Sequence, residues 1–388
     1  MSNEVIYKER KDTNCEKWDG LETVFGQKEL HAMWVADMDF EVPSCVKEAL
    51  AAYAAHGVFG YYNVPDAYYE AFIRWEKNYH DYAVEKEWIR YAPGVVPGIN
   101  WWIQILTQAK DSVIVLTPVY YPFLNAIKDN KRNLVTCDLI NHHGNYSIDF
   151  DAFERAIVDS QVKMFILSSP HNPVGRVWKE EELRRLMEIC EKHRIYVLSD
   201  EIHQDIVFTE KEQRPTAALG DYDKFLITLT AASKTFNLAA CQNSFVIIPN
   251  EELRAKYDAY TSAIHFTSGN AFGYIAVRAA LEKGRPWFEK VKDIIKENEV
   301  YVKTAFAQRL PEVEISPLEG TYLLWMNFAP YLKAEEIEDF MQKKCGLAFD
   351  YGHWFGGQQF GTFIRMNLAT SPESVKKAVD AILANLPQ

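Results

Sequence analysis

The chain has 388 residues, of which 48% are hydrophobic, and its formal net charge is −12 at pH 7. A single hydrophobic core stops growing at about 250–300 residues, so this length predicts two domains in a globular protein of ordinary composition. The negative charge argues against nucleic acid or an anionic membrane as a partner, because both attract clustered positive charge.

The six cysteines are scattered singly along the chain. Without a C-x-x-C pair they indicate neither a zinc site nor a disulfide framework, and we expect buried thiols and no metal. The opening segment is too polar for a signal peptide, and no apolar run approaches the roughly 18 residues that span a bilayer. We therefore expect a cytoplasmic protein.

Residues 1 to about 30 are polar, and we expect an irregular segment that Trp18 and Phe25 anchor. A first helix is predicted over residues 43–55, because proline is favoured in the first helical turn and apolar residues follow at helical spacing. An amphipathic helix is expected over residues 68–79.

Two turn segments accompany these helices. Residues 57–61 (GVFGY) have a glycine at each turn, and Tyr61 is either a surface residue or a donor to a phosphate group. Residues 94–98 are rich in glycine and precede an apolar helix that is expected to end near residue 109. A helix N-terminus offers free N–H groups and a positive dipole end to a phosphate, although such turns are common without any ligand.

Strands and helices alternate between residues 111 and 248. The clearest helix covers residues 180–193, with apolar residues at helical spacing, acidic residues first and basic residues last. This alternation predicts a mostly parallel sheet covered by helices, an α/β fold. Six apolar runs are predicted as strands: residues 112–118, 134–139, 163–169, 195–200, 225–230 and 245–249.

The pattern changes in the last hundred or so residues, where long helices dominate. Two apolar runs, residues 322–328 and 362–368, are predicted as strands and flank a helix over residues 334–344. Further helices are expected over residues 287–310 and 372–386. Strands at irregular intervals among helices suggest a second, smaller α/β domain.

Polar residues follow three of the apolar strands at the point where each strand ends: Asn172, Asp200 and Lys234. Ligands of parallel sheets bind beyond the carboxyl ends of the strands, so these side chains are expected at one crevice. Taken alone, a lysine after a strand is usually a solvated surface group. A desolvated lysine, however, has a lowered pKa and can form a Schiff base with a carbonyl.

A pyridoxal phosphate (PLP) enzyme needs a lysine for the aldehyde, a carboxylate for the ring nitrogen and a donor to the ring oxygen. Lys234, Asp200 and Asn172 offer these groups. The chain resembles the fold-type I PLP enzymes related to aspartate aminotransferase, and it is most similar to the MalY/PatB type of cystathionine β-lyase (cysteine-S-conjugate β-lyase). The matching stretches span almost the whole chain: MWVADMDF (33–40), GVFGY (57–61), GVVPG (94–98), SPHNPVGRVW (169–178), SDEIHQD (199–205), SKTFNLA (233–239) and FIRMNLA (363–369).

The resemblance implies an aminotransferase-like fold with a large PLP-binding domain of residues 49–285. The small α/β domain would combine residues 1–48 with residues 286–388. It also implies a homodimer, in which Tyr61 reaches the partner subunit's PLP phosphate. The enzyme would act in amino-acid metabolism, in methionine biosynthesis.

The resemblance further implies roles for individual residues. Tyr120 would stack on the cofactor ring and take part in catalysis, although a packed core tyrosine is the alternative. His203 is either a cofactor contact or a packed histidine. The residues implied to bind the cofactor are Lys234, Asp200, Asn172, Tyr120, His203, Val95 and Val96 through their backbone amides, Ser233 and Tyr61.

On the substrate side, the resemblance implies that Arg365 pairs with the substrate carboxylate, since its planar guanidinium suits a bidentate pair. A structural ion pair is the alternative. Asn172, Trp34 and Asp37 are the other implied substrate residues, and the segment that holds the last two is otherwise a packed connector. The aromatic, glycine-rich run of residues 351–357 is either a lid or an ordinary flexible loop.

Three functions remain open. The favoured one is α,β-elimination of a cysteine S-conjugate such as cystathionine to a thiol, pyruvate and ammonia. Gln242 favours it, because aminotransferases usually carry an arginine for the cofactor phosphate at this position and the β-lyase subfamily has glutamine. The alternatives are an aminotransferase acting on an amino acid and a 2-oxo acid, and a PLP-binding regulatory protein that only retains the fold.

Overall fold

The computed structural model describes residues 4–210 and 213–386. Its main sheet has seven strands: β2 (Ile89–Ala92), β3 (Ser112–Thr117), β4 (Asn133–Asp138), β7 (Val162–Ser168), β8 (Tyr196–Asp200), β9 (Leu226–Thr230) and β10 (Ser244–Ile247). They lie in the order β2-β10-β9-β8-β7-β3-β4. The five strands from β9 to β4 are mutually parallel, and β10 is antiparallel to both β9 and β2. The predicted mostly parallel sheet is therefore confirmed, and each predicted strand of this sheet lies within two residues of its expected bounds.

Both faces of this sheet are covered by helices, as its nearly all-apolar strands require. Val113 and Val115 point into the core on one face, with Trp102, whereas Ile114 and Leu116 point into the core on the other. The first face packs against α5 (Val95–Leu106), α6 (Tyr121–Asp129) and α9 (Glu251–Ala263), and the second against α7 (Phe150–Asp159) and α8 (Glu180–His193). Helix α8 has the predicted bounds.

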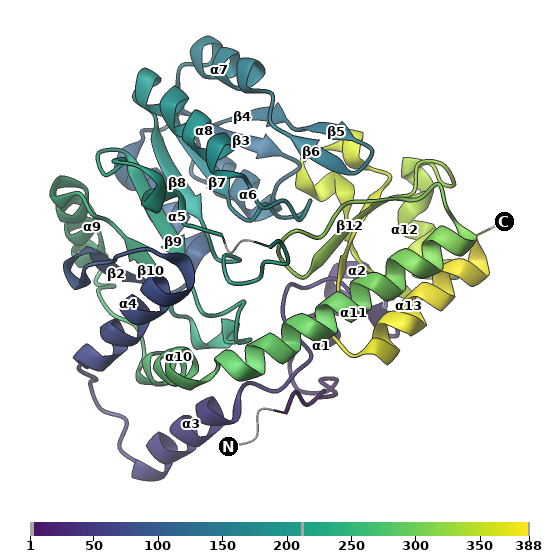
Figure 1. Cartoon of the computed structure of the whole chain (residues 1–388), viewed down its shortest axis with the longest axis horizontal. Helices are drawn as coiled ribbons and strands as arrows, with labels where there is room; N and C mark the ends of the chain where they lie inside the picture. The colour runs from purple at the N-terminus through teal and green to yellow at the C-terminus, as the bar shows by residue number, and fades with distance from the viewer. Residues whose placement is uncertain (1–3, 211–212, 387–388) are drawn as a thin grey trace.

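A second, antiparallel sheet has the order β11-β12-β15-β14. Its strands are β11 (Glu314–Ile315), β12 (Leu323–Asn327), β14 (Asp350–Tyr351) and β15 (Phe363–Asn367). The long helix α11 (Arg285–Arg309) and the last helix, α13 (Pro372–Asn385), lie side by side (Figure 1). The helix predicted over residues 334–344 is confirmed in its bounds, although its geometry changes along its length: a 3₁₀ turn (Ala334–Glu336), one α-helical turn, α12 (Ile337–Asp339), and a π-helical turn (Phe340–Lys344).

The N-terminal segment is more regular than expected, with α1 (Glu16–Asp19), α2 (Leu21–Phe25) and the short strand β1 (His31–Ala32). Tertiary contacts stabilise it, since Lys17 and Asp39 form a buried ion pair with a distance of 2.6 Å from Nζ to Oδ2. Strand β1 pairs in parallel with β13 (Leu347–Ala348).

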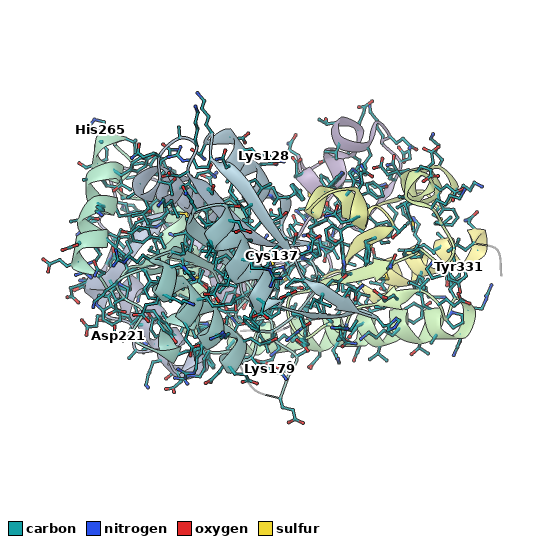
Figure 2. The ribbon with its side chains drawn as sticks, turned by 90° about the horizontal axis from the view of Figure 1, so that it is seen from above. Lys128, Cys137, Lys179, Asp221, His265 and Tyr331 are labelled. Carbon is teal, nitrogen blue, oxygen red and sulfur yellow. The ribbon has the colours of Figure 1, made fainter. Side chains whose placement is uncertain are left out.

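Seen from above, the purple N-terminal segment and the yellow C-terminal elements lie toward the side where Tyr331 is labelled, and Asp221 and His265 are labelled on the opposite side (Figure 2). This arrangement favours the expected small domain. The boundaries near residues 48 and 286 stay predictions.

The remaining helices are α3 (Ser44–His56), α4 (Asp66–His80) and α10 (Ala271–Lys283), and β5 (Ile140–His142) pairs with β6 (Asn145–Ser147) in a hairpin. Short 3₁₀ turns cover Lys86–Trp88, Thr216–Leu219, Ala239–Cys241, Gly352–Phe355 and Gln358–Phe360. Within the described residues, no helix has both the length and the apolar composition that crossing a membrane requires.

Candidate active site

One pocket opens at the carboxyl ends of the parallel strands. Its volume is about 190 Å³. Eight of the predicted site residues line it: Val95, Val96, Tyr120, Asn172, Asp200, His203, Ser233 and Lys234. The separate strand ends therefore bring Asn172, Asp200 and Lys234 to one crevice, as expected from the sequence.

Lys234 lies four residues beyond the end of β9, in a turn that directs its side chain into the pocket. Its Nζ donates a hydrogen bond to the carbonyl of Ala36 at 2.6 Å. Burial lowers the pKa of Lys234 to about 8, and the nearby Asp37 charge only partly opposes this. Near neutral pH an appreciable fraction of the amine is unprotonated and can act as a nucleophile or base.

Asp200 is the last residue of β8, and its carboxylate accepts a hydrogen bond from the backbone N–H of Ile202 at 3.0 Å. Burial raises the pKa of Asp200 to about 7, against the opposing effects of that hydrogen bond and of Lys234. A cationic group placed beside this carboxylate would favour its ionised form. Asp200 is thus built to face a positive charge.

The N-terminus of α5 points at the other end of the same pocket. The backbone N–H groups of Val95 and Val96 precede the first hydrogen bond of the helix, from Gly98 N to Gly94 O at 3.1 Å. No side chain in the part of the chain that the structure describes caps this end. Two free amides at the positive end of a helix dipole form a suitable site for a phosphate group.

His203 follows β8 and is 4% exposed. Its Nδ1 is buried and has no hydrogen-bond partner among the described residues, and its ring meets the edge of Tyr322 at 5.9 Å between centroids. Burial, and then the charge of Lys234, hold the pKa of His203 well below its ordinary value. The histidine is therefore neutral at physiological pH, both packed and directed at the pocket.

Arg365 lies on β15 and is only 1% exposed. Its Nη1 donates to Asn172 Oδ1 at 2.8 Å, and its Nη2 donates to Asp350. The guanidinium carbon lies 5.0 Å from the centre of the Phe355 ring. Arg365 does not line the cavity but contacts Asn172, which does. The structural ion pair, one of the two alternatives drawn from the sequence, is therefore present, and binding of the substrate carboxylate stays a prediction.

Other predicted residues lie outside the cavity. Trp34 is 5% exposed and donates from Nε1 to the carbonyl of Lys17 at 2.8 Å, as a packed connector would. Asp37 is close enough to influence Lys234, and its Oδ2 accepts from Arg10 at 2.7 Å. Tyr61 is fully exposed on the segment between α3 and α4.

Gln242 is exposed as well, and its side chain does not line the pocket. The neighbouring side chains of Asn243 and Ser244 line it instead.

The run of residues 351–357 is packed. Tyr351 and Phe355 are 1% and 0% exposed, and a Cβ on Gly352 would lie 1.9 Å from the carbonyl oxygen of Phe360. Trp354, half-buried, contacts the ring of Tyr121 at 5.7 Å between centroids. The segment is therefore packed against its neighbours and does not line the pocket, and a lid role stays a prediction.

Two buried contacts were not found from the sequence. The Tyr322 hydroxyl donates to the carbonyl of Ala36 at 2.9 Å, the same oxygen that Lys234 contacts. Asp350 holds Arg365. A lone acidic residue between Phe349 and Tyr351 is a usable signal for a buried pair, since an unpaired carboxylate is rarely buried.

The comparisons with known proteins agree with this geometry. The family model described as aminotransferase class I and II matches residues 33–382. The chain is 36% identical over 380 residues to cystathionine beta-lyase PatB of Bacillus subtilis, covering 97% of this chain and 98% of the relative. It is 29% identical to protein MalY of Escherichia coli, covering 97% and 96%. A solved structure, the PLP-bound C-S lyase from Staphylococcus hominis, superposes with a TM-score of 0.93 at 34% identity, covering 100% of this chain and 98% of that one.

The fold is that of the fold-type I PLP-dependent enzymes. Within that class the chain belongs to the aminotransferase class I and II family, and its similarity to the MalY/PatB type is confirmed. The residues present fit PLP: Val95 and Val96 suit the phosphate, Asp200 the ring nitrogen and Lys234 the aldehyde.

Proposed function

We propose that this protein is a PLP-dependent carbon–sulfur β-lyase, which converts cystathionine or another cysteine S-conjugate to a thiol, pyruvate and ammonia. One observation carries the proposal: Lys234, with a lowered pKa, and Asp200, with a raised pKa, line the same pocket as the N-terminus of α5. The names of its relatives, cystathionine β-lyase and C-S lyase, support the reaction type.

The residues divide the work between proton transfer and positioning. The Lys234 amine would remove the proton from the substrate Cα, which its pKa of about 8 allows near neutral pH. Bound PLP would supply the electron sink that makes this proton acidic, and Asp200 would keep a proton on its ring nitrogen. The amides of Val95 and Val96 would hold the phosphate, with Ser233 beside them, and Tyr120 would cover the ring.

The substrate's α-carboxylate would bind at Arg365 and Asn172, which are already joined by a hydrogen bond of 2.8 Å. Since any amino acid carries this group, these residues fix orientation and not the choice of leaving group. His203, neutral and buried, would contact the cofactor without adding charge. Asp37, whose charge acts on Lys234, is the candidate residue at the substrate entrance, whereas Trp34 is packed outside the cavity.

The same proposal includes a cytoplasmic homodimer that serves methionine biosynthesis. An apolar surface around Tyr61 supports the dimer: Val58 is 64% exposed, Phe59 is 59% and Phe272 is 39%. The rings of Phe59 and Phe272 contact each other with centroids 5.5 Å apart. Contiguous exposed aromatic side chains of this kind usually mark an interface. A sedimentation run that finds an active monomer would rule the dimer out, and Tyr61→Phe should weaken cofactor retention.

An end-product assay separates the lyase from the aminotransferase. We expect purified protein with PLP to release homocysteine, pyruvate and ammonia from L-cystathionine, and to form little glutamate from L-aspartate and 2-oxoglutarate. Fast glutamate formation without pyruvate would instead establish the aminotransferase. A protein that binds PLP but forms neither set of products would favour the regulatory alternative.

A further inference from the structure

Asp350 stands directly opposite Arg365 in the small-domain sheet. Strands β14 and β15 pair antiparallel with Asp350 in register with Arg365. Both side chains are buried, at 0% and 1% exposure, and the carboxylate accepts from Nη2 of the guanidinium. Side chains opposite each other in an antiparallel pair are close neighbours whose alignment the backbone fixes.

The guanidinium is oriented from two sides. Nη2 is taken by Asp350 and Nη1 by Asn172 Oδ1 at 2.8 Å, while the Phe355 ring covers the guanidinium carbon at 5.0 Å. Among the described residues, Arg365 Nε and Asp350 Oδ1 are buried polar atoms without a hydrogen-bond partner. Asn172 lines the pocket, so the Nη1 edge of the Arg365 guanidinium is the edge directed toward it.

A buried guanidinium without a counter-charge is costly, and removing one partner of a buried pair leaves the other uncompensated. Without Asp350, Arg365 would be free to turn toward any other acceptor or toward solvent. A displacement of about 1 Å in a positioning group can cost on the order of 100-fold in rate or binding. Asp350 therefore determines where the guanidinium points.

We propose that Asp350 is a positioning residue for the substrate's α-carboxylate: it holds Arg365 from the side away from the pocket, so that the edge next to Asn172 receives the carboxylate. The inference rests on the proposed function, because it assumes an amino-acid substrate. Asp350 touches neither substrate nor reacting atoms and acts only through Arg365.

The test compares a substrate that carries the carboxylate with one that does not. For wild type, Asp350→Ala and Asp350→Asn holoenzymes, kcat and KM are measured by pyruvate release from S-methyl-L-cysteine and by thiol release from both this acid and its carboxamide. For the acid, Asp350→Ala should raise KM about 10–100-fold with a smaller change in kcat, and the preference for acid over amide should fall by a similar factor. Asp350→Asn keeps a neutral acceptor for Nη2 and should therefore lose less of the preference than Asp350→Ala, about 3–10-fold.

Two controls locate the effect. Asp339→Ala removes an exposed carboxylate of the same domain, paired with Lys343, and should leave both constants unchanged. In an Arg365→Ala background, Asp350→Ala should change the acid-to-amide preference no further. If Asp350→Ala does not fold, Asp350→Asn carries the test with an expected rise in KM of about 3–10-fold for the acid alone.

The outcomes separate the two proposals. A wild-type protein that releases no thiol or pyruvate overturns the proposed function itself. An active wild type whose Asp350 variants keep the wild-type acid-to-amide preference overturns the positioning role alone, and so does a lowered KM in Asp350→Ala, which would mean that Asp350 competes with the substrate. An equal loss for acid and amide would show general damage to the fold and would also contradict the inference.

Discussion

Two buried polar clusters lie next to each other at the ends of β8 and β9. One is the pair Asp200 and Lys234 in the pocket. The other, here called the support cluster, consists of Trp75, His80, Asp205 and Thr235. Thr235 follows Lys234 directly, and Asp205 lies five residues after Asp200, so the same two chain segments supply both clusters.

The two aspartates differ in how many donors they have. Asp205 accepts from His80 at 2.7 Å, from Trp75 at 2.8 Å and from Thr235 at 2.5 Å. Burial would raise the pKa of Asp205, but these hydrogen bonds and the His80 charge outweigh it and lower that pKa. Asp200 has one backbone donor, and burial raises its pKa to about 7.

This difference shows that the chain assigns catalysis and stability to different buried residues. Buried polar groups with a full set of partners rigidify a fold, whereas buried groups with shifted pKa values and few partners concentrate at functional sites. The support cluster joins α4 to the turns that hold Asp200 and Lys234. These contacts hold in place the two segments that carry Asp200 and Lys234, whose side chains are costly to bury.

The largest expected effect comes from the pocket. Lys234→Ala removes the only proposed base and the attachment point of the cofactor, so kcat should fall by ~10³-fold or more. The measurement is pyruvate release from L-cystathionine. Lys224→Ala, at an exposed position just before β9, is the matched control and should keep wild-type turnover. Undiminished turnover in Lys234→Ala would remove this lysine from the mechanism.

Asp200→Asn should lower activity without lowering stability. The amide keeps the oxygen that accepts from Ile202 but cannot hold a proton on a ring nitrogen, so kcat should fall by ~10²-fold or more. Stability of the protein without cofactor at pH 8 should stay equal or rise, because a buried carboxylate with a raised pKa is costly when ionised. Activity and urea denaturation measure the two effects, and a large loss of stability would contradict this interpretation.

The sequence was informative about the pocket because its signals are local. All-apolar runs predicted buried parallel strands, and polar residues at their ends predicted the crevice that Asn172, Asp200 and Lys234 share. The resemblance added the α5 amides, since a glycine-rich turn alone is compatible with many roles. The chemistry of the site could therefore be predicted from short segments.

The support cluster and the Asp350 contact could not be predicted in this way. His80 and Asp205 are 125 positions apart, and nothing in a single sequence pairs a histidine of one helix with a carboxylate of a distant turn. For the same reason the short N-terminal helices were missed, because the contact of Lys17 with Asp39, and not helix propensity, stabilises them. Trp34 illustrates the converse: a motif residue of the family is packed away from the cavity.

Asp205→Asn should have the opposite effect and lower stability while activity is kept. It removes the hydrogen-bonded counter-charge of the buried His80 cation, so the free energy of unfolding should fall by ~3–5 kcal/mol. The protein that remains folded should keep kcat within about threefold of wild type, because no support residue touches the reacting atoms. Denaturation with urea and activity per folded protein at low temperature test this. A loss of activity at unchanged stability would place Asp205 in the catalytic machinery.

The smallest expected effect is a pH dependence that originates in His80. Its Nδ1 lies 3.1 Å from the carbonyl of Gln213 and its Nε2 lies 2.7 Å from Asp205, so both ring nitrogens face acceptors and the doubly protonated ring satisfies both. Burial would lower the pKa of His80, but the hydrogen bond to Asp205 and the charge of Glu76 raise it to about 9.

A histidine whose folded-state pKa lies above its ordinary value of about 6.5 stabilises the fold fully below that value, and its contribution is lost as the pH rises through about 9. Lys234, whose pKa is lowered, acts in the opposite direction above pH 8, so the comparison must be a difference between two proteins that both contain it.

His80→Gln keeps a neutral donor for Asp205 but cannot titrate. The stability difference between wild type and His80→Gln should be largest near pH 6 and shrink by ~1–2 kcal/mol by pH 10, since a charged hydrogen bond is replaced by a neutral one. Adding Asp205→Asn to both proteins should flatten this dependence, whereas a difference that stays constant with pH would show that the ring is neutral in the folded protein and that the support cluster carries no charge pair.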